Sequence, residues 1–323
     1  MKTYCVFVWV LASVFAFNMP GFGWGNEGHM TVAYAAYQKL TPAAKKRVAI
    51  LIKLNPDYKN GKWTKMIPAG TPAKFRPMML VMIAATWPDQ IKSETGYTDD
   101  GPDPNGNRPD GATSSQNIGY TDHLHHKYWH FVDTPFSQDG TSITGFTIPT
   151  PNAQTRIKDF RAVIASTDSD DLKSYDLVWL LHLIGDVHQP LHASTRVTAA
   201  EHEGDNGGNN VLTCGTPCKS KTKLHAFWDD LPGTSKDPNA AVTLGKSLPK
   251  PDGTLAADTD TDHWIAESFA AAQSSVYVNP PIGADDGPFS LTAAYKTASK
   301  TLAKQRVALA GARLAKVINE ELK

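Results

Sequence analysis

Two His/Asp pairs with the same spacing are the residues of this chain best suited to chemistry. His182 and Asp186 lie four positions apart, as do His225 and Asp229. Because residues four apart share one face of an α-helix, each pair projects an imidazole beside a carboxylate, a combination that zinc binds. One such pair is equally compatible with a buried helix whose histidine only makes hydrogen bonds. Two pairs indicate more than one metal ion, and multinuclear zinc sites hydrolyse phosphoesters.

Further histidines extend this possible metal site. Pro190 interrupts the helix that carries the first pair, and His192 follows just beyond the break. In the histidine-rich segment 123–133 we expect His130 to lie in the interior, because apolar and aromatic residues flank it. The other histidines of the segment are expected in a loop, namely His123, His125 and His126. The alternative that one of these three binds metal stays open.

The N-terminal segment predicts export. Lys2 is followed by an apolar run over 5–17 and then by small residues at the minus-three and minus-one positions before a cleavage site after Gly23. The run is shorter than the roughly 20 apolar residues that a membrane-spanning helix needs. We therefore expect a signal peptide over 1–23 and a single domain over 24–323, secreted or periplasmic and without a membrane anchor.

Cleavage after Gly23 would make Trp24 the first residue of the mature protein. His29 would then lie about one helical turn from a free α-amino group, which binds metal once it is deprotonated. The alternative is that Trp24 is only a hydrophobic plug and His29 a surface residue.

The charge balance and the cysteine content limit the kinds of binding site that this chain can form. Removal of Lys2 leaves 31 of the 32 basic residues against 32 acidic ones, which argues against a broad electrostatic surface for nucleic acid. Of three cysteines, Cys5 leaves with the signal peptide. Cys214 and Cys218 are expected to form a small disulfide in a loop. A Cys-x3-Cys zinc knuckle is the alternative, although no second thiol pair would complete it.

Apolar periodicity predicts a mainly α-helical fold, and strand signals are scarce. The expected helices cover 29–39, 42–54, 75–91, 154–165, 171–187, 224–229, 264–272 and 291–322. The residues of the last helix that keep helical spacing are expected in the core, namely Ala303, Val307, Ala310, Leu314 and Val317. Segments 93–122 and 134–153 are predicted to be loops.

Six short motifs occur together in this chain. They are Trp-Gly-x-x-Gly-His at 24–29, Ala-Thr-Trp-Pro-Asp at 85–89, Trp-His-Phe-Val-Asp at 129–133, the segment 182–192, Gly-Gly-Asn at 207–209, and the pair in 225–229. Together they resemble the zinc-dependent single-strand nucleases of fungi and plants, of the S1 and P1 type, which share a superfamily with zinc phospholipase C. The resemblance covers nearly all of 24–323.

The resemblance implies a mainly α, single-domain phospholipase C/nuclease-type fold around a cleft with three zinc ions. One ion would be bound by Asp89, His130, His182 and Asp186. A second would be bound by His192, His225 and Asp229. The third would be bound by the backbone of Trp24, by His29 and by a shared Asp186. Asp89 would also be catalytic, because it would orient the attacking water.

The implied reaction is cleavage of single-stranded DNA and RNA at the P–O3′ bond by a zinc-bound hydroxide, giving 5′-phosphorylated products, together with hydrolysis of 3′-nucleotides. Phe131 would stack on a base and Asp133 would bind its edge, with Asn209 also in contact with substrate. For Phe131, simple core packing is an equal alternative.

Two other functions remain open. A phospholipase C would use the same metals on a phospholipid headgroup. A non-catalytic zinc-binding protein is less well supported, because such proteins usually carry repeated His-rich tracts, whereas these ligands are dispersed and mixed with carboxylates.

Overall fold

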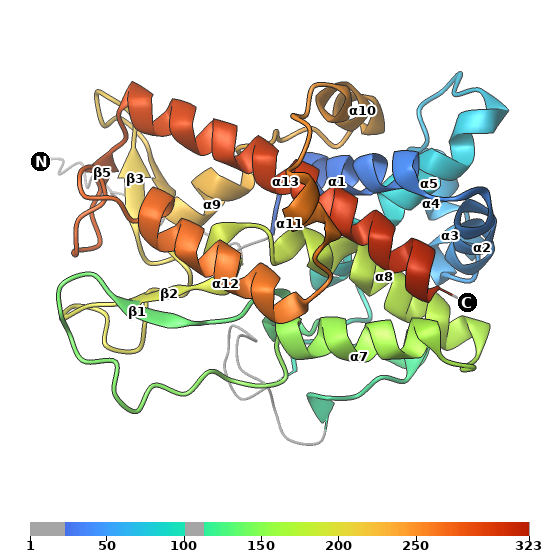
Figure 1. Ribbon diagram of the computed structural model, residues 1–323, viewed down its shortest axis with the longest axis horizontal. Coiled ribbons are helices and arrows are strands. Elements are labelled where there is room, and N and C mark those ends of the chain that lie inside the picture. The colour runs from blue at the N-terminus through green and yellow to red at the C-terminus, as the bar shows by residue number, and fades with distance from the viewer. Residues whose placement is uncertain (1–22, 101–112, 323) are drawn as a thin grey trace, which may run out of the picture.

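Helices form most of the regular structure in the computed structural model, which describes residues 23–100 and 113–322 (Figure 1). The α-helices are α1 Asn26–Lys39, α2 Pro42–Ile52, α3 Pro56–Lys59, α4 Lys62–Met66, α5 Arg76–Ala84, α6 Trp87–Gln90, α7 Ala153–Ala165, α8 Asp170–Asp186, α9 Leu224–Asp229, α10 Pro238–Lys246, α11 Gly253–Ala257, α12 Thr261–Ala271 and α13 Ala293–Glu321. The short 3-10 helices are η1 Ala73–Phe75, η2 Ile91–Ser93, η4 Gly119–Thr121, η5 Lys127–His130 and η6 Pro190–Ala193, and η7 Ala272–Val276 is π-helical. Apart from Gly23, the predicted signal peptide lies outside the described residues.

Short strands form two small sheets beside the helices. β1 Pro135–Ser137 pairs in parallel with β2 Thr195–Val197, with Phe136 opposite Arg196. In the second sheet, β3 Leu212–Cys214 lies between β4 Lys221–Lys223, which is antiparallel to it, and β5 Phe289–Ser290, which is parallel. The fold is therefore mainly α, as the sequence predicts.

Helix α8 runs through the middle of the molecule. Its N-terminus is capped by Ser169, whose hydroxyl accepts from the Leu172 N–H, and acidic residues occupy the first turn. Every residue from Lys173 to Asp186 is buried, because α7, α2, α1 and α13 all pack against this helix. Apolar residues on all sides of the helix match this position. The first His/Asp pair, His182 and Asp186, thus lies on the most enclosed helix of the fold.

Most helices predicted from periodicity are confirmed with small shifts at their ends. α1 begins three residues earlier than expected, and α13 covers 293–321 of the expected 291–322. Local caps account for several boundaries: Thr41 caps α2 ahead of Pro42, and Asn152 forms a capping box with Thr155 at the start of α7. The expected core residues of α13 are confirmed as fully buried: Ala303, Val307, Ala310, Leu314 and Val317.

One predicted helix, over 75–91, is wrong as a continuous element. The structure breaks it at Ala85 and Thr86 into α5 and α6. Pro88 explains the break, because it has no N–H to donate to Ala84 and its ring would clash with that carbonyl in a continuous helix. The predicted loops also hold short elements that periodicity did not reveal: η4 in 93–122 and β1 in 134–153.

The disulfide between Cys214 and Cys218 is confirmed, which excludes the zinc-knuckle alternative. It closes the turn between β3 and β4. Among the described residues, no helix combines the length and apolar composition required to cross a membrane.

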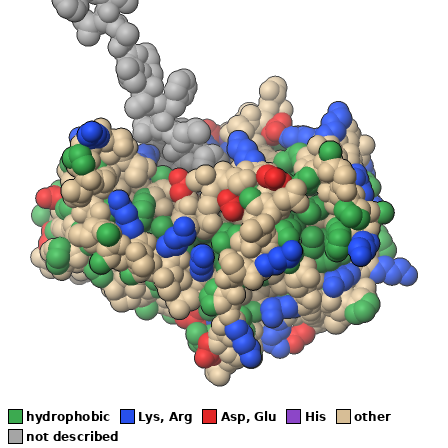
Figure 2. All heavy atoms as spheres, turned by 90° about the horizontal axis from the view of Figure 1, so that it is seen from above, with side chains coloured by type: hydrophobic (Ala, Val, Ile, Leu, Met, Phe, Trp, Pro, Cys, Tyr) green, Lys and Arg blue, Asp and Glu red, His purple; other side chains and the backbone are tan. Residues whose placement is uncertain are grey.

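The surface seen from above in Figure 2 carries Lys and Arg side chains that are dispersed among uncharged and hydrophobic ones. No histidine of the described chain is visible on this face, in keeping with the burial of most histidines. The dispersed charge agrees with the near-neutral composition.

Helices α1 and α13 approach closely at Gly311. A Cβ atom at this position would lie 2.6 Å from the Ala35 Cβ and 3.1 Å from the Val32 carbonyl oxygen, neither of which can rotate away. A glycine thus permits the backbone contact between the two helices. This packing fixes α1, which carries His29.

We predict that Gly311→Ala destabilises the protein by roughly 1–2 kcal/mol, because overpacking at the helix contact outweighs the higher helix propensity of alanine. The matched control is Gly253→Ala, where an added Cβ meets nothing within 4 Å. The free energy of unfolding, measured by denaturant titration, checks the difference. An equal change in both variants would contradict the close approach at Gly311.

Candidate metal centre

The histidines and aspartates expected to bind metal converge in the interior, in groups whose potential ligand atoms all lie within 4.8 Å of one another. The three groups are His29, Asp89 and His182; His130, His182 and Asp186; and His192, His225 and Asp229. All of these residues are buried. They come from six short segments of the chain, between α1 and α9, so only the tertiary fold brings them together.

The largest assembly surrounds Asp186. Its Oδ2 lies 2.9 Å from His130 Nδ1 and 3.2 Å from His182 Nε2, while its Oδ1 lies 3.2 Å from His29 Nε2. Asp89 is more distant, 3.6 Å from His182 Nε2 and 4.0 Å from His29 Nε2. Asp186 therefore lies between the side chains that the resemblance assigns to two different ions, as a shared ligand must.

The expected first residue of the mature chain lies beside this assembly. The Trp24 side chain is fully buried, and the Gly25 N–H donates to the Asp229 carbonyl oxygen at 3.0 Å. Gly23 approaches Asp186 so closely that a Cβ atom there would lie 1.6 Å from Oδ1. The peptide bond between residues 23 and 24 thus adjoins the carboxylate that also faces His29. The surface position considered for His29 is wrong, because its ring is buried and stacks on His182 with ring centroids 3.7 Å apart.

Backbone carbonyls determine which nitrogen of each key histidine faces the centre. His182 Nδ1 lies 2.7 Å from the Ala85 carbonyl oxygen, and His192 Nδ1 and His225 Nδ1 lie at the same distance from carbonyls of His130 and Gly207. A carbonyl only accepts, so each Nδ1 carries the proton in the neutral ring and each Nε2 presents a lone pair. Because the helix is interrupted between α5 and α6, the Ala85 carbonyl oxygen is available to accept from His182 Nδ1.

Two of these lone pairs face each other. His192 Nε2 and His225 Nε2 are 3.1 Å apart, and Asp229 Oδ2 lies 3.5 Å from His225 Nε2. With both Nδ1 atoms donating to carbonyls, neither neutral ring has a proton to place between the two nitrogens. Between two neutral rings the contact is repulsive, and a metal ion or protonation of one ring removes the repulsion. Two imidazoles with a carboxylate are ligands of a zinc site.

Burial shifts the pKa of two histidines of the centre in the direction that favours metal binding, and it has the opposite effect on the Asp229 carboxyl. Burial, reinforced by the positive charge of Lys92, lowers the pKa of His130 to about 3, so the ring is neutral at pH 7. Burial and His182 likewise lower the pKa of His29. Burial raises the pKa of Asp229 well above its ordinary value, and the charges of Asp89 and Asp186 add to this shift. Bound cations would relieve the cost of ionising Asp229.

Two residues that the sequence did not single out support the ligands. Lys92 Nζ donates to Asp89 Oδ1 at 2.8 Å, and its side chain is only 2% exposed. Gln189 Nε2 donates to Asp229 Oδ1 at 2.8 Å while its own Oε1 accepts from the Leu191 N–H. The position of Lys92, one helical turn after Asp89, was a signal that could have identified it.

The Gly-Gly-Asn turn positions the second His/Asp pair. Gly207 has a φ of 58°, and a Cβ atom there would lie 2.5 Å from the Leu191 carbonyl oxygen, so the turn requires glycine. Its carbonyl is the one that accepts from His225 Nδ1. The motif therefore orients a potential ligand through backbone contact.

With this geometry established, comparison with known proteins identifies the family. The S1/P1 nuclease family matches residues 24–323. This chain belongs to the S1/P1 nuclease family. It is also similar to Endonuclease 4 of Arabidopsis thaliana, with 25% identity over 225 residues, which cover 64% of this chain and 54% of that protein. The match thus spans about half the length of this relative.

The other histidines of segment 123–133 take different roles in this member of the S1/P1 nuclease family. His123 is exposed, and His125 Nδ1 lies 2.8 Å from Asp99 Oδ1. His126 is fully buried, and its two ring nitrogens each lie 2.7 Å from a carboxylate, of Asp100 and of Asp122. The open alternative of ligand exchange is unsupported for His126, whose nitrogens are both engaged. Its buried structural role was not evident from the sequence.

The residues expected to bind substrate lie near the centre. Phe131 directly follows His130, is half-buried and packs against the main hydrophobic core. Asp133 is half-buried and lines a cavity. Asn209 is in the turn after Gly207 and Gly208, and its Nδ2 donates to the Asn206 carbonyl oxygen at 2.9 Å. Their contact with substrate stays a prediction.

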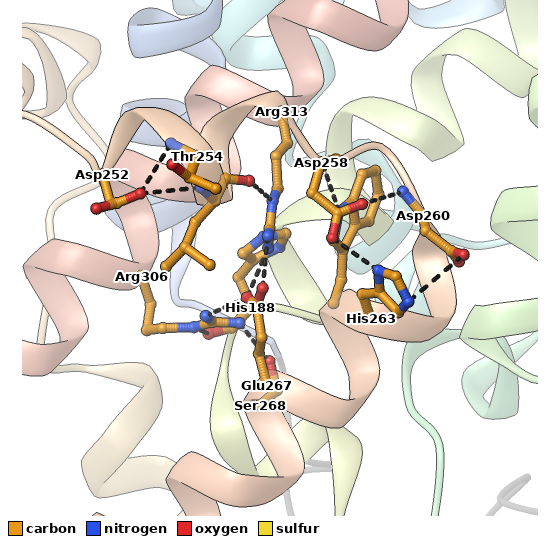
Figure 3. A network of polar contacts seen from close by, with 12 residues as sticks. His188, Asp252, Thr254, Asp258, Asp260, His263, Glu267, Ser268, Arg306 and Arg313 are labelled. Carbon is orange, nitrogen blue, oxygen red and sulfur yellow. Dashed lines mark hydrogen bonds and ion pairs between the residues drawn. The ribbon is translucent and has the colours of Figure 1, made fainter.

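A buried ionic network holds the end of α8 (Figure 3). The Arg313 guanidinium donates to His188 Nε2 at 3.0 Å and to both oxygens of Glu267. Arg306 donates to the same carboxylate and to the His188 carbonyl oxygen. Because His188 follows Asp186 by two residues, α12 and α13 position the C-terminal turn that carries the shared carboxylate. Burial opposes ionisation of Glu267, yet the two arginines lower its pKa below the ordinary value.

We predict that Glu267→Gln lowers the free energy of unfolding at pH 7 by roughly 2–3 kcal/mol, because two buried arginines lose their charged partner. The lowered pKa of Glu267 means that its stabilisation is present above about pH 4.3 and is lost as the pH falls further, so parent and variant should converge in acid.

The control is Glu320→Gln, whose partner Lys316 is 34% exposed, and this change should cost less than about 0.5 kcal/mol. Denaturant titrations at several pH values measure both variants. A difference between parent and Glu267→Gln that stayed constant down to pH 3 would exclude the ionic role of Glu267.

Proposed function

We propose that this protein is an exported, zinc-dependent nuclease that hydrolyses single-stranded DNA, RNA and 3′-nucleotides, with residues 24–323 as one catalytic domain. The observation that carries the proposal is the convergence of two imidazoles and a buried carboxylate: His192 Nε2 and His225 Nε2 lie 3.1 Å apart, beside Asp229. Membership of the S1/P1 nuclease family and the name of the similar Arabidopsis protein, Endonuclease 4, support a nuclease over a phospholipase C or a zinc-storage protein.

The proposed ligands hold three zinc ions. One set is Asp89, His130, His182 and Asp186, the second is His192, His225 and Asp229, and the third is Trp24, His29 and Asp186. The orphaned polar atoms support this assignment: His29 Nε2 and Asp186 Oδ1 are buried without a hydrogen-bond partner among the described residues, and they face each other at 3.2 Å. A cation between them would satisfy both.

Zinc bound in this centre would lower the pKa of water towards 7 and stabilise negative charge on the phosphate oxygens. The chain then has to orient the reacting groups. Asp89 has a side chain that is 8% exposed, whereas that of Asp186 is fully buried, so we assign Asp89 to the substrate side, where it accepts a hydrogen bond from the attacking water. Lys92 holds the Asp89 carboxylate in place and keeps it ionised.

Recognition of the nucleotide is assigned to residues that border the centre. Phe131 would stack on an unpaired base, Asp133 would accept from its amino edge, and Asn209 would contact the sugar or base. A base inside a duplex offers neither its face nor its pairing edge, so single strands are the preferred substrate.

Signal cleavage would complete the third site. In the uncleaved chain the Trp24 nitrogen belongs to a peptide bond and cannot coordinate as an amine does. Gly23 lies against Asp186, in the place where a free α-amino group at Trp24 would emerge. We therefore assign assembly of this site to the exported, mature protein.

The first test measures hydrolysis of single-stranded DNA, RNA, 3′-AMP and phosphatidylcholine by the protein beginning at Trp24, with and without chelator and added zinc. We expect chelator-sensitive cleavage of the first three substrates. Asp89→Asn should lower kcat/KM by at least about 100-fold, because the attacking water loses its acceptor and a ligand is weakened. The exposed Asp262→Asn is the control and should leave activity unchanged. Turnover of phosphatidylcholine alone would refute the nuclease proposal.

The second test compares the protein beginning at Trp24 with one that carries a few extra residues before it. The extended protein should bind one zinc ion fewer and lose most of its activity, because its Trp24 nitrogen is an amide. Zinc content by atomic absorption and hydrolysis of 3′-AMP are the measurements. The same residues appended after Lys323 serve as the control. Full zinc content and activity in the N-terminally extended form would exclude Trp24 as a ligand through its amine.

A further inference from the structure

A row of lysines runs along the N-terminal half of α13. Lys296, Lys300 and Lys304 are spaced by four residues, so they share one side of the helix and follow one another at about 6 Å along its axis. Together with Thr297 and Thr301 they line a shallow hollow of about 340 Å³. The three ammonium groups can therefore face a single ligand that lies along the helix.

The turn closed by the disulfide extends this positive surface. A Cβ atom on Gly215 would lie 3.9 Å from Lys296 Nζ, and the Leu291 N–H, just before α13, donates to the Cys214 carbonyl oxygen at 3.0 Å. The turn and the strand β4 that follows it carry three further lysines, namely Lys219, Lys221 and Lys223. Six lysines thus lie on two adjoining segments.

No nearby stretch of sequence supplies carboxylates to neutralise these lysines. There is no Asp or Glu from 206 to 228 or from 287 to 319, although the whole chain is balanced at 32 basic and 32 acidic residues. Among the described residues, none of the six lysines has a carboxylate partner, whereas Lys62 and Lys316 each have one. Unpaired like charges repel one another, so this surface is suited to an anionic ligand.

Helix α9 connects the lysine row to the candidate metal centre (Figure 1). One side of α9 carries His225 and Asp229, two of the potential ligands. On another side, Trp228 Nε1 donates to the Tyr295 hydroxyl oxygen at 3.1 Å, and Tyr295 directly precedes Lys296. The row therefore begins across one helix, roughly 10 Å in diameter, from the centre. A strand bound at the centre can reach the lysines with a phosphate a few nucleotides away.

The surroundings of the row favour a strand over a membrane as the ligand. Basic helices that bind membranes insert aromatic or large aliphatic side chains between the lipids. Here Thr297 and Thr301 lie between the lysines. The large hydrophobic side chains that are exposed in the described chain all lie outside α13 and the disulfide turn: Ile50, Phe75, Ile118, Ile143 and Leu255. A narrow row of point charges without an apolar face matches a linear chain of phosphates.

We propose that the lysine row of α13, continued by the lysines of the disulfide turn and β4, is an exosite that binds backbone phosphates of a single-stranded nucleic acid whose scissile phosphodiester lies at the metal centre. The inference rests on the proposed nuclease function. The exosite reads no base, because every nucleotide carries the phosphate that a lysine contacts. It acts on the binding of long strands and leaves the reaction at the centre unchanged.

The test compares the zinc-loaded parent with a variant in which Lys296, Lys300 and Lys304 are all replaced by Gln. The substrates are a single strand of about 30 nucleotides, long enough to occupy both sites, and 3′-AMP, which cannot reach the row. KM for the strand should rise about tenfold, and its logarithm should depend less steeply on the logarithm of the salt concentration, by about 2, because each phosphate contact contributes roughly 0.7. KM for 3′-AMP and kcat for both substrates should be unchanged.

The matched control replaces three exposed lysines of the α2–α3 region by Gln, namely Lys46, Lys53 and Lys59. It removes the same net charge at a distance from α13 and should leave KM and its salt dependence close to those of the parent. A second measurement is sedimentation of parent and row variant with phosphatidylglycerol vesicles, which should show no difference between them.

The exosite is excluded, and the nuclease proposal stands, if the parent hydrolyses both substrates and the row variant behaves like the control. Equal loss of activity on 3′-AMP and on the strand also overturns it, because this would show a structural defect. Loss of vesicle binding with unchanged KM for the strand would assign the row to a membrane instead. If the parent hydrolyses neither substrate, the nuclease proposal fails and the exosite fails with it.

Discussion

His192 and His225 bring their Nε2 atoms within 3.1 Å of each other, and ring nitrogens of His29 and His130 lie within 3.2 Å of the buried Asp186 carboxylate. Polar groups of this kind destabilise a protein interior unless a cation lies between them. The centre can therefore persist only because the surrounding structure holds each group in place. The arrangement is typical of metal sites, in which the ligands are fixed before the ion is bound.

That support comes from backbone carbonyls and from charged side chains outside the centre. Carbonyls at Ala85, His130 and Gly207 each fix one imidazole, and each is available because the local chain departs from regular structure. Pro88 breaks the helix, so α5 ends at Ala84 and α6 begins only at Trp87. Gly207 adopts a turn that a side chain would block. Arg306 and Arg313, joined by Glu267, hold the segment at the end of α8 through contacts with His188.

The same segments also carry residues that we propose to bind substrate. The turn that orients His225 continues into Asn210, which contacts Glu201, and the irregular segment after His130 contains Asp133. Under the proposed function, a change in either segment affects both metal binding and recognition of the nucleic acid.

Local spacing in the sequence determined much of this protein. The helical period predicted α8 and the core face of α13, and the four-residue spacing predicted that His182 and Asp186, like His225 and Asp229, share a helix face. Such features depend on neighbours within one turn. Tertiary structure alone decided that Gln189 donates to Asp229, that His126 lies against Asp100, and that two loops enclose a cavity. These contacts join segments whose separation in the chain carries no periodic signal, so only packing of the complete fold establishes them.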